Sequence, residues 1–287
     1  MNEKALQSVA DILASRHEQY IPVASTAGIA PSDLRRAVEL FRSIMFGGYF
    51  DTLPLADSLR ELAFVVANQT THARVAFLHE NYDDAVRNGE QTATALLEEL
   101  PELRRRLATD VKAVFDGDPA AKSYEEIVLC YPALVAMTHY RFAHALLELG
   151  VPVLPRMITE MAHSKTGIDI HPGAEIGDYF SIDHGTGVVI GETCIIGSHV
   201  RLYQGVTLGA KSFKFDDAGN IVREPRHPIL EDNVVVYSNS SILGRIRIGH
   251  DSVIGGNVWQ TASLPPHSHV VQGRTRSLAT FENGSGI

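Results

Sequence analysis

Hydrophobic residues follow two different periods in the two halves of the chain. Up to about residue 165 they recur every three or four positions, which is the spacing of amphipathic helices. From Ile170 onward, an aliphatic residue returns at every sixth position instead. The pattern predicts an all-α domain over residues 1–165, followed by a second domain of different architecture. The helical groups are Leu6, Val9, Ile12 and Leu13; Leu34, Val38, Phe41 and Ile44; Leu62, Val65 and Val66; and Leu96, Leu97, Leu100 and Leu103.

Local signals mark the ends of some of these helices. Ser32 directly after Pro31 predicts an N-cap, and residues 101–115 predict a helix with an acid near its start and arginines further along. Gly150, with prolines two and five positions beyond it, predicts the end of the preceding apolar helix.

The six-residue period is neither that of a helix nor that of a strand. It fits short strands joined by tight turns into a left-handed parallel β-helix, in which three hexads make one triangular coil. The repeat predicts about four to five coils over residues 166–274. An antiparallel sandwich with coincidental spacing is the alternative, and the length of the series argues against it. The series is Ile170, Ile176, Ile182, Val188, then after a slip of two Ile190, Ile196, Leu202, Leu208, and finally Leu230, Val236, Ile242, Ile248 and Ile254.

A second inward position is expected four residues after each of these aliphatic residues. Its occupants are mostly small or β-branched, and Phe180 is the exception. Glycines that follow the aliphatic residue suit corners where a Cβ would be crowded. The expected inward residues are Ala174, Thr186, Cys194, Val200, Val206, Val234, Ser240 and Ser252.

Two segments interrupt the period. Residues 209–228 contain turn signals and no hexad, which predicts a loop that leaves one coil. Residues 275–287 have no period and predict a flexible C-terminal tail.

Composition narrows the function classes. The formal net charge of −9 over 287 residues argues against a general nucleic-acid surface. Only two cysteines, Cys130 and Cys194, occur, so a disulfide framework is excluded and a reducing compartment is favoured. No stretch reaches the ~20 apolar residues of a membrane span, and no signal-peptide pattern opens the chain. These features predict a cytoplasmic protein without a membrane segment.

Histidines and acidic residues lie at positions of the β-helix that are outside its inward-facing series. Asp169 and His184 are close to one coil apart in sequence, so they can lie near one edge on adjacent coils. An Asp that holds one imidazole nitrogen leaves the other free to take a proton from a hydroxyl. The sequence thus predicts a general base, with a solvated or structural histidine as the alternative.

Further along, Arg226 and His227 precede a proline at the end of the loop. A guanidinium that can bind in bidentate fashion, together with an imidazole, suits the binding of a carboxylate. We expect no metal site, because no two histidines within the repeats have suitable spacing. Cys194 is expected to be core filler, since an apolar interior raises a thiol's pKa.

These motifs together resemble the serine O-acetyltransferase family. The resemblance rests on GIDIHP, DHGTG, VIGET, VTLG and RHP within a hexapeptide β-helix that follows a helical region. It implies acetyl transfer from acetyl-CoA to the hydroxyl of L-serine, the first step toward cysteine, with feedback inhibition by L-cysteine and without a metal. It further implies a direct attack with no acyl-enzyme intermediate.

The resemblance also implies roles for individual residues. His184 is the general base and Asp169 its orienting partner. The remaining substrate contacts are Asp118 and Asp183 for the ammonium, Arg226 and His227 for the carboxylate, and Glu192 beside them; Ala210, Ser238 and Gly256 lie along the coenzyme A groove.

Assembly and partners follow from the same resemblance. Family members form trimers, often joined as dimers of trimers, with the active site between subunits. The final Ile287 resembles a tail that inserts into O-acetylserine sulfhydrylase. The long N-terminal region and the enlarged loop over residues 211–224 depart from the commoner short form, which leaves the choice between a trimer and a hexamer open.

Two other functions compete with this reading. One is a hexapeptide acyltransferase that acts on homoserine, a sugar or an antibiotic. The other is a non-catalytic scaffold of the cysteine pathway that acts through its tail.

Overall fold

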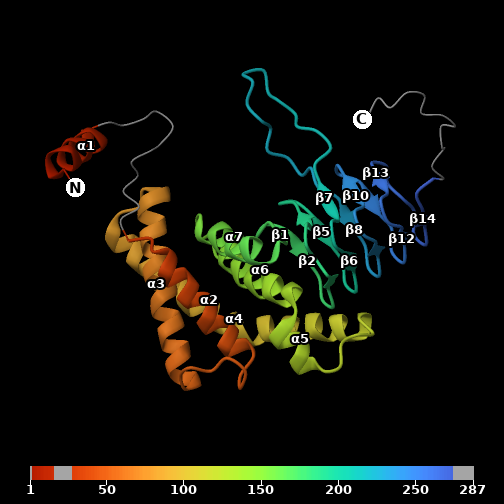
Figure 1. Cartoon of the computed structure of the whole chain (residues 1–287), viewed down its shortest axis with the longest axis horizontal. Helices are drawn as coiled ribbons and strands as arrows, with labels where there is room; N and C mark the ends of the chain where they lie inside the picture. The colour runs from red at the N-terminus through yellow and green to blue at the C-terminus, as the bar shows by residue number, and fades with distance from the viewer. Residues whose placement is uncertain (1, 16–27, 274–287) are drawn as a thin grey trace.

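The computed structural model describes residues 2–15 and 28–273. Within these ranges, a helical region precedes a three-sided parallel β-solenoid (Figure 1). The helices are α1 (Glu3–Ser15), α2 (Pro31–Met45), α3 (Leu55–Leu78), α4 (Tyr82–Gly117), α5 (Tyr124–Cys130), α6 (Pro132–Glu148) and α7 (Leu154–Thr166). The two predicted halves and their order are therefore confirmed.

Helix boundaries differ from the predictions at two places. The residue at the N-cap of α2 is Ala30, and Pro31 occupies the first helical turn, so the assignment of Ser32 was wrong. Proline at N1 lacks only an N–H that has no partner in the helix anyway. Residues 101–115 do not begin a helix either, because α4 runs for 36 residues and contains Pro101 in its interior. The end at Gly150 is confirmed, since α6 closes at Leu149.

The helices α2, α3, α4, α6 and α7 enclose an apolar core. Phe41 of α2 stacks on Phe142 of α6 with ring centroids 4.7 Å apart, and both side chains are fully buried. Helix α1 differs, because Leu6 and Val9 on its apolar side are exposed. None of the described helices is long and apolar enough to cross a membrane.

The solenoid consists of three parallel sheets that form the faces of a triangular prism. Sheet A has the order β1-β4-β7-β10-β13, sheet B the order β11-β8-β5-β2, and sheet C the order β14-β12-β9-β6-β3. The strands are β1 (Asp169–Ile170), β2 (Glu175–Ile176), β3 (Ser181–Asp183), β4 (Val189–Ile190), β5 (Ile195–Ile196), β6 (Arg201–Tyr203), β7 (Thr207–Gly209), β8 (Ile229–Leu230), β9 (Val235–Val236), β10 (Ser241–Leu243), β11 (Arg247–Ile248), β12 (Val253–Ile254), β13 (Trp259–Gln260) and β14 (His269–Val270).

The thirteen predicted hexad residues all fill the prism, although Val188 does so at the second inward position, because Ile190 pairs with Ile170. Each of the thirteen aliphatic residues is at most 5% exposed. The second inward position is also confirmed at Ala174, Cys194 and Ser240, which are fully buried. Thr186 was predicted to share this role but is exposed, and the buried Val188 takes its place.

The slip of two in the hexads has a structural cause. The corner between β3 and β4 holds two extra residues, so Asp169 pairs with Val189, whereas Val189 pairs with Thr207 one regular coil later. Because the extra residues stay in the corner, the register of the later strands is preserved. This longer corner carries His184.

Glycine is required at some corners by close approach. At Gly177, a Cβ would lie 2.8 Å from the carbonyl group of Gly197 on the next coil, which is too close for any real contact. The coils can therefore stack at the ~4.8 Å strand spacing only with glycine there.

A buried ion pair joins the helices to the first coil. Arg141 of α6 donates to both carboxylate oxygens of Asp110 of α4, at 3.0 and 2.9 Å, and both side chains are 1–2% exposed. Two further guanidinium protons reach the carbonyls of Ile176 and Gly177 at 2.9 and 2.8 Å. Since α4 and α6 are both fixed to the solenoid in this way, the end of α4 is held at a defined place beside it.

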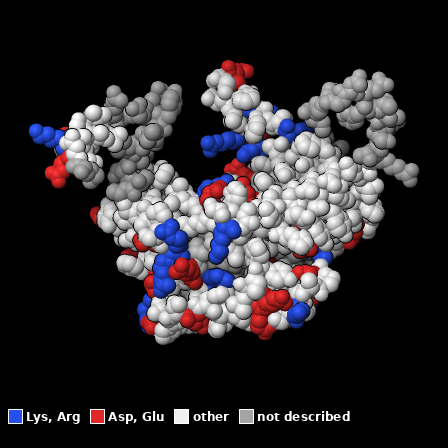
Figure 2. Space-filling view, viewed as in Figure 1, with Lys and Arg blue, Asp and Glu red and all other residues white. Residues whose placement is uncertain are grey.

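The predicted loop leaves the solenoid after β7 and returns at β8. It is a hairpin in which Phe215 pairs with Ile221 in antiparallel fashion, and both side chains are exposed. In Figure 1 it extends well away from the coils. Figure 2 shows acidic and basic groups interspersed over the helical half, while the solenoid presents mostly uncharged groups on this face.

Candidate active site

The predicted site residues lie on two different corners of the prism. The His184 corner joins sheets C and A and contains His184, Gly205, Asn239 and Asn257 on successive coils. The His227 corner joins sheets A and B and contains His171, Glu192 and Thr193, and His227.

At the His184 corner, the imidazole projects from the surface. His184 has a left-handed backbone (φ 56°), and its side chain is 75% exposed. Its Nε2 lies 3.8 Å from a carboxylate oxygen of Asp183, the last residue of β3. The exposed imidazole is therefore accessible to a hydroxyl from solvent.

Helix α4 delivers a second carboxylate to this corner. Its last residue is Gly117, whose carbonyl accepts a 3.1 Å bond from Nη1 of Arg201 on β6. A cation at the C-terminus of a helix stabilises the helix dipole. Asp118 follows immediately, so the bond from Arg201 also fixes where this acid lies.

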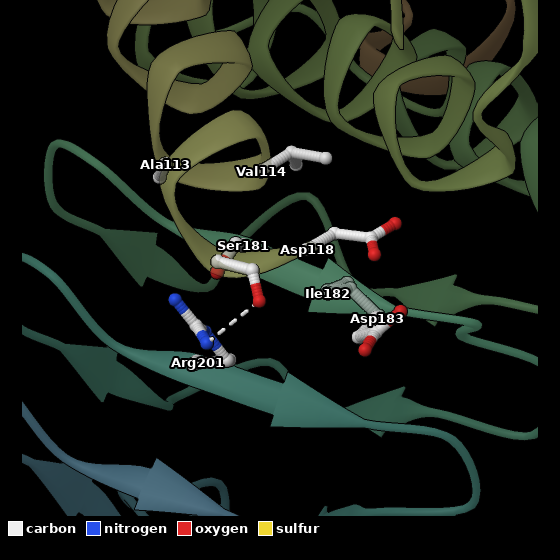
Figure 3. A pocket seen from close by; sticks show the side chains of 8 residues that line it. Ala113, Val114, Asp118, Ser181, Ile182, Asp183 and Arg201 are labelled. Atoms are coloured by element: carbon white, nitrogen blue, oxygen red, sulfur yellow. Dashed lines mark hydrogen bonds between the residues drawn. The ribbon is translucent and has the colours of Figure 1, made fainter. Parts of the chain in front are cut away.

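Asp118 and Asp183 face the same crevice. It lies between the end of α4 and strands β3 and β6, and Figure 3 shows both carboxylates on one side of it, with the Arg201 guanidinium on the other. Ala113 and Val114 line the wall formed by α4. Two carboxylates beside an apolar wall provide a site for a cation of small size.

The carboxylate of Asp118 is fixed by hydrogen bonds on both oxygens. The hydroxyl of Tyr131 donates to Oδ2 at 2.6 Å, and the backbone N–H of Ala120 donates to Oδ1 at 2.8 Å. These bonds, with smaller contributions from nearby His184 and Arg201, lower the pKa of Asp118. The same bond raises the pKa of Tyr131 to about 12. Asp118 is thus ionised and Tyr131 neutral at physiological pH.

The His227 corner is built around Thr193. Its hydroxyl accepts from the backbone N–H groups of Arg226 and His227 at 3.0 and 3.1 Å, which fastens the returning end of the loop to the preceding coil. The ring of His227 lies so close over Gly191 that a Cβ there would collide with it. The glycine of VIGET is therefore needed for the position of the imidazole.

His227 is a neutral imidazole with one defined tautomer. Its Nδ1 accepts from the backbone N–H of Thr193 at 3.0 Å, so the ring proton resides on Nε2 and can be donated. Burial, and secondarily the charge of Arg226, lower the pKa of His227 to about 4. Burial likewise lowers the pKa of His171 on the same corner.

Arg226 is paired with Glu192 in this structure. Its Nη2 lies 2.8 Å from a carboxylate oxygen of Glu192, and the arginine side chain is 26% exposed. Because this bond uses only Nη2, the other nitrogens of the guanidinium can still bind a carboxylate.

The structure does not bring Asp169 to His184. Asp169 Oδ1 instead lies 3.5 Å from Nη1 of Arg156 on α7, and among the described residues the ion-pair partner of His184 is Asp183.

Two residues of the site were missed by sequence reasoning. Tyr131 lies 13 positions from Asp118, and no local pattern connects them. Arg245 donates from Nη1 to the carbonyls of Thr193 and His227, at 2.5 and 3.0 Å, and so ties three coils together at the His227 corner. The sequence signal that could have indicated its role was the position of Arg245 directly after the corner residue Gly244.

The remaining predicted residues divide between the two corners and the core. Ser238 and Gly256 stack on one another at the His184 corner, where a Cβ on Gly256 would lie 3.3 Å from the Ser238 carbonyl. Ala210 follows β7 at the His227 corner.

Cys194 is fully buried, and burial raises the pKa of its thiol to about 12, which confirms the prediction that it fills the core. Ile287 lies outside the described residues.

Comparisons with known proteins point to one family. A plasmid-encoded serine acetyltransferase of Synechococcus elongatus is 55% identical over 194 residues, which cover 67% of this chain and 60% of the relative. The chain therefore spans about 60% of that relative's length. No model of a known protein family matches the sequence.

Solved structures agree with the sequence comparison. Serine acetyltransferase isoform 3 of Entamoeba histolytica, in complex with cysteine, superposes with a TM-score of 0.74 at 36% identity, covering 86% of this chain and 84% of that one. A serine acetyltransferase of Brucella abortus in complex with coenzyme A has a TM-score of 0.57 at 28% identity, covering 75% and 81%.

Proposed function

Because the chain belongs to the serine acetyltransferase family, we propose that it transfers the acetyl group of acetyl-CoA to the hydroxyl of L-serine. The observation that carries the proposal is the pair of carboxylates, Asp118 and Asp183, that face one crevice (Figure 3). His184 is next to them, because its Nε2 lies 3.8 Å from Asp183. A hydroxyl substrate that also carries an ammonium group fits this arrangement, whereas a sugar brings no positive charge to the two carboxylates.

His184 acts as the general base. Its exposed Nε2 removes the proton from the serine hydroxyl, and the oxygen attacks the thioester carbonyl carbon of acetyl-CoA. The C–S bond then breaks, and the imidazolium returns the proton to the coenzyme A thiolate. Asp183, 3.8 Å away, stabilises the imidazolium. The proposed role of Asp169 is to orient the imidazole, which requires a rotation of His184 toward it, because in this structure Asp169 is paired with Arg156.

The carboxylate of serine requires the other corner. Arg226 and the Nε2–H of His227 provide a charge and a donor for it. In serine, however, the ammonium and the carboxylate are separated by a single carbon atom, while the two corners lie at opposite edges of sheet A, on the order of 15 Å apart. One chain cannot therefore bind both ends of the same molecule.

This separation supports a trimer. In a three-fold assembly with parallel solenoids, the His184 corner of one subunit meets the His227 corner of its neighbour, so each site takes its ammonium contacts from one chain and its carboxylate contacts from the next. Acetyl-CoA then lies along the His184 corner past Ser238 and Gly256, opposite Ala210 of the neighbour. The coenzyme A complex of the Brucella relative supports the binding of coenzyme A.

L-Cysteine has the same two charged ends as L-serine. We expect it to bind the same site and to inhibit competitively with respect to serine. The cysteine complex of the Entamoeba relative supports this expectation.

The decisive experiment is thiol release from acetyl-CoA with L-serine, D-serine, homoserine or a sugar as acceptor. Release specific to L-serine and suppressed by L-cysteine supports the proposal. Preference for another acceptor assigns the chain to a different hydroxyl substrate. The absence of thiol release with every acceptor favours the scaffold function.

The sulfhydrylase partner remains a prediction from the sequence. Deletion of Ile287 is expected to abolish binding of O-acetylserine sulfhydrylase in calorimetry while acetyl transfer continues. Unchanged binding contradicts the prediction.

A further inference from the structure

The third corner of the prism, between sheets B and C, carries a cluster that the proposed reaction does not use. On the fourth and fifth coils, His250, Asp251 and His267 converge. Nδ1 of His250 lies 2.6 Å from Oδ2 of Asp251, and Nδ1 of His267 lies 3.9 Å from the same oxygen. The ligand-capable atoms of all three lie within 4.8 Å of one another. We propose that this cluster binds a divalent transition-metal ion, with Zn²⁺ as the best match, which joins the last coil to the fourth.

The donor set and its spacing fit Zn²⁺. Two imidazole nitrogens and one carboxylate oxygen are ordinary zinc ligands, with a water in the fourth position. Bonds of ~2.1 Å in a tetrahedron place ligand atoms roughly 3.4 Å apart. The separations of 2.6 and 3.9 Å lie on either side of this value, so small side-chain rotations suffice to centre an ion.

The backbone holds the three residues in place without a metal. Asp251 and His267 both occupy the left-handed region, with φ of 55° and 60°, as the equivalent residues of this corner do on the earlier coils. The N–H of His267 donates to the carbonyl of His250 at 2.9 Å, which stacks the fifth coil on the fourth. A site built on such a repeated corner does not need to order a flexible loop on binding.

Outer contacts orient the ligands. Asn233 donates to Oδ1 of Asp251 at 3.0 Å, while Oδ2 faces Nδ1 of His250 at 2.6 Å. An ion between Oδ2 and Nδ1 would replace their hydrogen bond and leave the bond from Asn233 in place. Glu231 accepts from the backbone N–H of His250 at 2.9 Å, while Arg247 neutralises its other oxygen. Hydrogen bonds of this kind to ligand residues are typical of metal sites.

Solvent has access to the cluster. The side chains of His250, Asp251 and His267 are 46%, 40% and 71% exposed. The corner is also separate from the His184 and His227 corners, so an ion there does not compete with the substrates of the proposed reaction.

The test is calorimetric titration of ZnCl₂ into the full chain after treatment with a chelator. The proposal predicts that the double variant His250→Gln/His267→Gln binds one equivalent fewer than the wild type. The matched control, His199→Gln/His269→Gln, removes two exposed histidines of the solenoid that lie outside the cluster and should keep the wild-type stoichiometry. Asn233→Ala should weaken the same site by roughly 10-fold, because it orients Asp251.

Thermal melting separates a coil-joining ion from incidental binding. Zn²⁺ should raise the Tm of the wild type and of the control, and leave the Tm of the cluster variant unchanged. Equal stoichiometry in the cluster variant, or an equal rise of its Tm with Zn²⁺, overturns the proposal. Neither readout depends on enzymatic activity, so the result stands apart from the proposed function.

Discussion

The phenol of Tyr131 and the carboxylate of Asp118 form a 2.6 Å hydrogen bond that spans the connection between α4 and α6. This bond fixes one oxygen of the acid, while the backbone N–H of Ala120 fixes the other at 2.8 Å. It also keeps the acid ionised, because the donor favours the charged form. The tyrosine therefore acts on substrate binding through another residue.

Tyr131→Phe should raise the KM for L-serine about 5-fold and leave kcat nearly unchanged. A hydrogen bond to a partly exposed charged group contributes about 1 kcal/mol, which corresponds to that factor. Steady-state kinetics at saturating acetyl-CoA measure both constants. Tyr124→Phe, which alters an exposed phenol of α5, is the matched control. A fall in kcat alone would assign Tyr131 a different role.

His184→Ala should lower kcat by ~10²–10⁴-fold without destabilising the fold. The loss follows from the removal of a general base, and the stability is retained because the side chain is 75% exposed. His199→Ala provides the control, since His199 is also exposed and left-handed but lies on another corner. Near-normal turnover of the His184 variant would exclude it as the base.

Arg245→Met should reduce kcat/KM for L-serine about 10-fold by loosening the His227 corner. The guanidinium bonds to the Thr193 and His227 carbonyls are lost, so the imidazole that meets the substrate carboxylate is no longer held at one place. Arg247→Met removes an exposed pair with Glu231 on another face and should have no such effect. Equal losses in the two variants would indicate a general effect of charge.

The stability of the fold should decline as the pH falls from about 6.5 to about 4. The pKa of His227 is lowered to about 4 in the folded chain, so between these values the unfolded state binds more protons. Urea unfolding midpoints across this interval measure the decline. His227→Gln should decline less steeply, and an identical slope in both proteins would contradict the assignment.

Arg141→Met should destabilise the protein by about 3–5 kcal/mol. The substitution leaves Asp110 as an uncompensated charge that is 1% exposed. Urea unfolding gives the free energy, and Arg105→Met, which breaks a half-exposed pair with Asp178, should cost far less. The double variant Arg141→Met/Asp110→Leu should recover much of the loss, because no buried charge remains.

The repeat architecture could be predicted from the sequence because its information is local. A hexad position such as Ile196 points inward whatever the rest of the chain does, so periodicity alone sets the coils, their number and the excursion loop. The contacts that complete the site are of another kind. Arg141 meets Asp110 through the packing of α4 against α6, and Arg245 meets Thr193 across coils, so neither pair follows from any local pattern.

In this structure Asp169 and His184 each have another ion-pair partner, Arg156 and Asp183, so their predicted contact stays a prediction. Their separation in sequence is close to one coil, but the direction of a corner side chain depends on its φ and on the residues inserted beside it. The same insertion explains the error at Thr186. Register survives such an insertion, whereas side-chain direction does not.

The long connection between β7 and β8 is thermodynamically cheap. Thr207 pairs with Ser241, so the number of residues between these two paired positions is nearly twice the number in a regular coil. A doubling of a closed loop costs only about 0.6 kcal/mol of chain entropy. Peptides inserted at Gly219, around which no atom lies within 4 Å of a Cβ, should therefore leave the melting temperature almost unchanged, and this position is suited to carrying a label or a tether.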